Sequence, residues 1–140
     1  MRANIILLTA TILWGVWGWA DKNAVARAHP FTIQWMYSIP YIIFIPLWYW
    51  LGAKMAPATN LDSGAFFWAI SASIVSMVAA ILLLFALQLK PASIAVSITS
   101  GYPVITLILS VLSGSEGFSW QKLIGILFVF IGLVILQIGQ

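Results

Sequence analysis

The sequence contains no cysteine and very few charged side chains. Six Lys or Arg and three Asp or Glu are spread over 140 residues, so 6% of the chain is charged and 63% is hydrophobic. A soluble domain carries about 25% charged residues, and this composition therefore excludes an ordinary soluble fold. The missing cysteines exclude a disulfide framework. The basic residues form no cluster, which argues against nucleic acid as a partner.

Groups that could perform catalysis or hold a metal ion are also scarce. His29 is the one histidine of the sequence and precedes a proline in a predicted loop, and the three acidic residues form no pair. General acid–base catalysis and metal binding both need such groups close together. The sequence therefore predicts neither an enzyme nor a protein with a bound cofactor or metal.

The chain does contain five long apolar stretches. They cover approximately residues 4–20, 31–51, 64–87, 93–112 and 120–138. A transmembrane helix needs about 20 predominantly apolar residues, and none of these stretches has a charge at its centre. We therefore predict an all-α membrane protein that crosses the lipid bilayer several times, with a single five-helix domain over residues 1–140.

The basic residues are balanced between the two sides of this predicted topology. Each side carries three, namely Arg2, Lys54 and Lys122 against Lys22, Arg27 and Lys90. An excess of Lys and Arg on the cytoplasmic side normally sets the orientation, so the balance favours neither. One interpretation is the weak bias of a short protein. The other is dual topology, in which the chain inserts both ways and forms an antiparallel homodimer.

Several segments resemble one EamA-type unit of the drug/metabolite transporter superfamily, and together they span the whole chain. They are LWGVWGWADKNA (13–24), HPFTIQW (29–35), ALQLKPASIAV (86–96) and the block 102–136. The last block is the most specific, with a helix-breaking proline, a Gly-x-Glu turn at Glu116 and a final helix with glycines seven residues apart.

This resemblance implies a fold, a location and an activity. Members are inner (cell) membrane carriers of small metabolites, usually with ten helices in two inverted halves, and the present chain resembles a half-length, five-helix member. Small multidrug resistance proteins of the same superfamily work as antiparallel dimers. Two features depart from the pattern: Tyr37 stands where the family often has an arginine, and no acid precedes Asp21 in the first stretch. The resemblance therefore does not extend to proton-coupled export by a carboxylate within that helix.

The segment 97–106, SITSGYPVIT, is the polar interruption of the fourth stretch. Tyr102 and Pro103 lie close to its centre, hence near the membrane midplane. Pro103 has no N–H, so the carbonyl of Thr99 loses its helical partner, and in lipid such a group must be satisfied in another way. Some of the hydroxyls are explained by bonding to carbonyls of their own helix. The others predict a water-facing wall, with Pro103 as its hinge.

We therefore predict a substrate cavity at the midplane, between copies of the first, third and fourth helices. Its predicted lining is Trp14, Ser76, Ser97, Tyr102 and Thr106. Aromatic and hydroxyl groups without a fixed charge suit a small neutral, zwitterionic or aromatic metabolite that resembles an amino acid, carried by alternating access. The alternative is a scaffold without transport activity or a subunit of a heteromeric transporter.

Four glycines are predicted to support helix packing or a dimer interface. They are Gly15, Gly18, Gly125 and Gly132. Small residues on one face of a membrane helix allow another helix to approach closely. Beyond Lys122 the last helix carries no polar side chain before Gln137, and it is predicted to pack against another helix, including one from a second copy.

Overall fold

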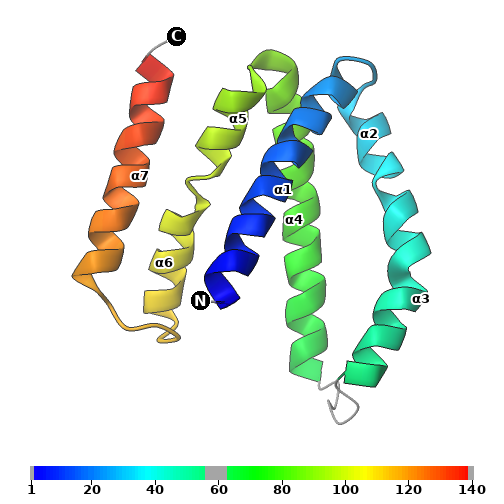
Figure 1. The fold of residues 1–140 in the computed structure, drawn as a ribbon, viewed down its shortest axis with the longest axis horizontal. Coiled ribbons are helices and arrows are strands. Elements are labelled where there is room, and N and C mark those ends of the chain that lie inside the picture. Colours follow the sequence, from blue (N-terminus) through cyan, green and yellow to red (C-terminus); the bar gives the residue numbers. More distant parts are fainter. Residues whose placement is uncertain (1, 56–62, 139–140) are drawn as a thin grey trace. The chain divides into compact units, whose positions relative to one another are not determined.

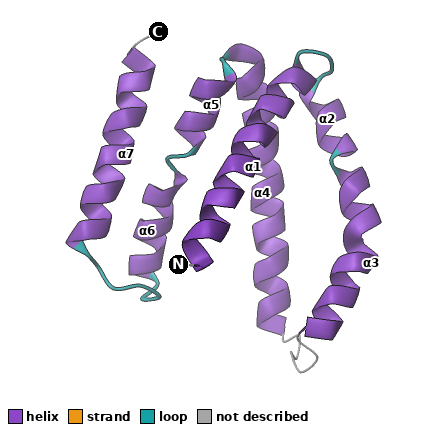
Figure 2. Cartoon of the chain, in the orientation of Figure 1, coloured by secondary structure: helices purple, strands orange, loops and turns teal. Residues whose placement is uncertain are grey.

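The computed structural model describes residues 2–55 and 63–138, and within these ranges it contains helices and loops but no strand (Figure 2). The helices are α1 (Arg2–Val25), α2 (Pro30–Met36), α3 (Ser38–Met55), α4 (Ser63–Leu89), α5 (Ala92–Thr99), α6 (Tyr102–Leu112) and α7 (Trp120–Ile138). The all-α prediction is confirmed.

The helices follow the order of the predicted apolar stretches, because α2 with α3, and α5 with α6, each continue one stretch across a short break. Three helical stretches of the described chain are long and apolar enough to cross a membrane: Pro30–Met55, Ser63–Leu89 and Ala92–Leu112. The last helix contains a shorter apolar stretch, Trp120–Ile135. This composition fits a multi-pass membrane protein.

Both breaks occur about one turn before a proline. Pro40 cannot donate to the carbonyl of Met36, and α2 ends at Met36, although Tyr37 keeps right-handed helical backbone angles (φ −61°, ψ −24°). In the same way, α5 ends at Thr99, and Pro103 lies in the first turn of α6, where a proline needs no hydrogen-bond partner for its nitrogen. The two prolines thus explain why two of the stretches are divided.

The chain forms two compact units, and the boundary between them falls inside α1. The first unit comprises the chain up to Ala20 together with the chain from Leu89 onwards, and the second comprises Asp21–Gln88. In the first unit, α7 runs beside α5 and α6 in the opposite direction (Figure 1). The contact is close at Gly101, where an added Cβ would lie 2.9 Å from Cδ1 of Leu133.

The second unit has a small buried core near one end of its helices. Its buried apolar residues come from the end of α1, from α2 and from the end of α4, namely Val25, Pro30, Ile33, Leu83, Leu84 and Leu87. By contrast, none of the side chains of α3 is buried. Large apolar faces left exposed in this way are those that lipid or another membrane helix covers.

Candidate functional site

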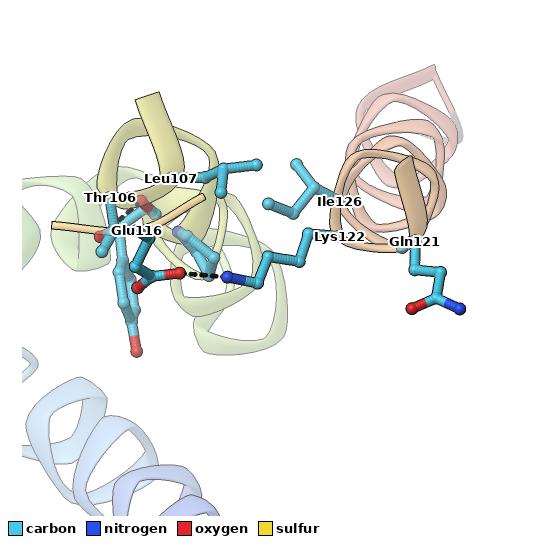
Figure 3. A pocket seen from close by; sticks show the side chains of 9 residues that line it. Thr106, Leu107, Glu116, Gln121, Lys122 and Ile126 are labelled. Carbon is cyan, nitrogen blue, oxygen red and sulfur yellow. Dashed lines mark hydrogen bonds and ion pairs between the residues drawn. The ribbon is translucent and has the colours of Figure 1, made fainter. Parts of the chain in front are cut away.

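A pocket of about 360 Å³ lies between α6 and α7 in the first unit (Figure 3). Its lining is Tyr102, Pro103, Thr106 and Leu107 from α6, Glu116 from the linker, and Gln121, Lys122, Gly125 and Ile126 from α7. Each helix contributes residues at positions i, i+1, i+4 and i+5, which is one helical face. The volume lies at the lower end of the roughly 300–1,000 Å³ of small-molecule sites.

The floor of the pocket is apolar, and a glycine keeps it open. Leu107 and Ile126 point toward each other from the two helices, whereas Gln121 points away (Figure 3). A Cβ added at Gly125 would meet no atom of the described residues within 4 Å. The missing side chain at Gly125 therefore leaves space beside α6 that a larger residue would fill.

An ion pair stands at this pocket. The Lys122 ammonium reaches from α7 to Oε2 of Glu116, and the two side chains are 45% and 47% exposed. A pair with this exposure contributes at most about 1 kcal/mol to stability. A ligand with one ammonium and one carboxylate group can therefore separate Lys122 from Glu116 and pair with each of them, because breaking their ion pair costs little free energy.

A helix-terminating turn positions Glu116. Gly114 has φ +71°, and its N–H donates to the Val111 carbonyl at 3.1 Å while the Ser115 N–H donates to the Ser110 carbonyl at 3.0 Å. These two bonds form a Schellman motif, which satisfies the last carbonyls of α6 and favours glycine. The turn directs the chain back so that Glu116 meets α7.

The predicted aromatic residues lie together. The rings of Trp14 and Tyr102 have centroids 6.5 Å apart at an interplanar angle of 75°, an edge-to-face arrangement. Both rings are more than half exposed, at 60% and 54%. Tyr102 lines the pocket itself, so α1 brings a second aromatic ring next to the pocket wall.

The predicted hydroxyl residues are more dispersed. Ser97 donates to the Ser93 carbonyl at 2.6 Å, and Thr106 donates to the Tyr102 carbonyl at 3.2 Å, so both bond to their own chain. Thr106 lines the pocket with an oxygen that still accepts hydrogen bonds. Ser97 does not line the pocket, and Ser76 is exposed on α4 in the second unit.

The four predicted packing glycines differ in their surroundings. A Cβ at Gly18 would lie 2.7 Å from Cγ2 of Val96, so glycine permits the approach of α1 to α5. A Cβ at Gly15, Gly125 or Gly132 would meet no described atom within 4 Å. The close contact at Gly101 was not predicted, because its sequence signal, a glycine before a proline, also fits a simple turn.

A second polar group lies in the second unit. Asp21 is 3% exposed, and the Tyr37 hydroxyl donates to its Oδ1. Asp21 lies just after the predicted span 4–20. Burial raises the pKa of its carboxyl above the usual range, and the hydrogen bond from Tyr37 partly opposes that rise. Beside it, Lys22 Nζ donates to the carbonyl of Leu87 at 2.5 Å and so caps the last turn of α4.

Among the residues that the structure describes, no group of three His, Cys, Asp or Glu side chains could hold a metal ion.

Comparison with known proteins gives a match over almost the whole chain. A sequence model described as the EamA-like transporter family matches residues 1–138. An uncharacterized protein of Methanocaldococcus jannaschii is 29% identical over 138 residues, which cover 99% of this chain and 98% of that protein. No solved structure gives a significant match.

Proposed function

The chain belongs to the EamA-like transporter family, and on that premise we propose that it carries a small zwitterionic metabolite of amino-acid size across the membrane. The observation that supports this substrate class is the pocket between α6 and α7. One positive and one negative side chain stand at its edge, above an apolar floor.

The two charges suit the two ends of a zwitterion. The carboxylate of Glu116 accepts hydrogen bonds from a substrate ammonium, and the ammonium of Lys122 donates to a substrate carboxylate. The substrate side chain then contacts Leu107 and Ile126, with the Tyr102 ring beside it. A ligand with a single charge leaves one member of the ion pair without a partner, and is therefore bound less well.

The divided fourth span provides the movement that alternating access requires. Transporters commonly place their substrate against discontinuous helices. Here the break at Ser100 and Gly101 separates α5 from α6, and α6 forms one wall of the pocket. Rotation of α6 about this break, with Pro103 as the hinge, opens the pocket to one side of the membrane at a time.

A second copy in the opposite orientation completes the carrier. The equal number of basic residues on the two sides supports dual insertion, and a relative of similar length supports a unit of this size. Gly132 is exposed and has open space around it within the chain, and it is the residue of α7 proposed for that contact.

The substrate class is tested with three ligands that share a phenyl ring. Proteoliposomes containing the full chain are loaded with unlabelled ligand, and counterflow of labelled L-phenylalanine, phenylethylamine or 3-phenylpropionate is measured. We expect L-phenylalanine to be exchanged at least tenfold faster than the cation or the anion. Equal rates for all three, or no rate above that of empty liposomes, would contradict the proposal, and the second result would favour a heteromeric subunit or scaffold.

A further inference from the structure

Asp21 is a buried acid that the proposed transport pathway does not use. It lies in the second unit, whereas the pocket lies in the first, and its side chain is 3% exposed. Burying a carboxylate is unfavourable unless its charge is compensated by hydrogen bonds or a cation, or removed by a proton. The surroundings of its two oxygens indicate which of these applies.

The two carboxylate oxygens of Asp21 differ in their hydrogen bonding. Oδ1 accepts the hydroxyl proton of Tyr37, but Oδ2 is buried and has no hydrogen-bond partner among the described residues. Oε1 of Gln34 is likewise buried without a partner in that part of the chain. Tyr37 is the C-cap residue of α2, so its bond to Asp21 connects the end of α1 to the junction of α2 and α3.

The unpaired Oδ2 of Asp21 is a buried acceptor without a donor among the described residues, and a proton bound there satisfies it. An ionised carboxylate only accepts hydrogen bonds, whereas a protonated carboxyl also donates one. A proton on Oδ2 therefore removes the buried charge and leaves Oδ1 free to accept the bond from Tyr37. The proton comes from solvent, and the step is the simple equilibrium in which the carboxylate and a hydrated proton give the neutral acid.

The other ionisable groups of this region are already engaged. Lys22 directs its ammonium to the Leu87 carbonyl at 2.5 Å, and Nδ1 of His29 accepts the Phe31 N–H at 3.3 Å. Tyr37 takes part as a neutral donor. Desolvation dominates the surroundings of Asp21, since burial raises the pKa of its carboxyl more than the Tyr37 bond lowers it.

We propose that Asp21 is a proton-binding site that fastens the end of α1 to the junction of α2 and α3. With the proton bound, the neutral carboxyl remains buried against Tyr37. Without it, the charge favours hydration, and the contact loosens. The site acts as a pH-sensitive latch, and its existence does not depend on what the protein transports.

Proton binding is measured directly on the full-length protein in detergent, labelled with 13C at the aspartate side-chain carboxyl. The sequence has two aspartates, Asp21 and Asp62, so two carboxyl signals are expected. We expect one to titrate at a higher pH than the other and to disappear in Asp21→Asn. Tyr37→Phe removes a bond that stabilises the charged form, so the same signal should titrate at a still higher pH.

Three results would overturn the latch. They are two signals that titrate together in the ordinary range of aspartate, a high-pH titration that persists in Asp21→Asn, and a lower midpoint in Tyr37→Phe. The wild-type titration alone decides the first of these, so the test holds even when a variant fails to fold. Asp62→Asn is the matched control, because it removes the other aspartate and should leave the signal that titrates at the higher pH in place.

Discussion

Neutralising either member of the ion pair at the pocket should weaken substrate binding by a modest and similar factor. The variants are Glu116→Gln and Lys122→Gln, which keep the size and polarity of a side chain but remove its charge. Both groups line the pocket, and they are the two partners of one ion pair. If a zwitterion binds between them, each variant loses one charged contact.

The exposure of the two side chains sets the magnitude. A fully desolvated charged hydrogen bond contributes about 1.5–3 kcal/mol, but these groups are 45% and 47% exposed, and solvent screens them. We therefore expect a loss of about 1 kcal/mol for each variant, which is about a fivefold rise in KM at an unchanged protein level. The assay is the concentration dependence of L-phenylalanine counterflow in proteoliposomes.

Two further variants separate the charge effect from nonspecific damage. Lys54→Gln removes a lysine that lies 5.0 Å from the Trp50 ring in the second unit, and its KM should stay unchanged. The double reversal Glu116→Lys with Lys122→Glu restores one charge of each sign and should recover most of the lost affinity. A KM for Glu116→Gln and Lys122→Gln equal to that of the wild type would refute the assignment of these residues to the substrate.

Three other predictions follow from the same geometry. Gly125→Leu should fill the pocket and abolish uptake without lowering the Tm, because its Cβ enters open space. Gly132→Leu should leave ligand binding intact and weaken the dimer in detergent. Loss of the dimer in Gly125→Leu together with loss of ligand binding in Gly132→Leu would contradict both assignments. Gly114→Ala should cost about 1–2 kcal/mol, because φ is +71° there, and should lower the Tm by a few degrees, while Gly117→Ala should have little effect. A tag at the C-terminus should be accessible from both sides of the membrane, and accessibility from one side alone would exclude dual topology.

The helices could be predicted from the sequence because their signals are local. Apolar stretches of membrane length indicate helices, and Pro103 indicates a break in the fourth stretch, whereas the break before Pro40 is recognised only in the structure. The C-terminal end of α1 is harder to predict from the sequence. The charged run after Ala20 suggested a loop, but α1 continues to Val25, because this run contains no glycine or proline. The helical continuation is what buries Asp21 against Tyr37.

The pocket depends on which faces of two helices meet, and this is not encoded locally. Tyr102 and Thr106 were predicted to face the substrate from their position in the fourth span, and they do line the pocket. From the sequence, Glu116 belongs to a turn, Lys122 contributes to the charge balance of one side, and Gly125 is a packing residue. Their common location follows from the turn at Gly114 and the antiparallel course of α7, which no single stretch of sequence specifies.

Whether the pocket between α6 and α7 binds a zwitterionic substrate is best decided by a binding measurement on the purified protein. Isothermal titration of L-phenylalanine into the wild-type protein and into Gly125→Leu, at equal concentration in the same detergent, compares an open pocket with a filled one. We expect saturable binding to the wild type and none to Gly125→Leu, with equal Tm values for the two proteins. Equal binding to both proteins would mean that the substrate binds outside this pocket.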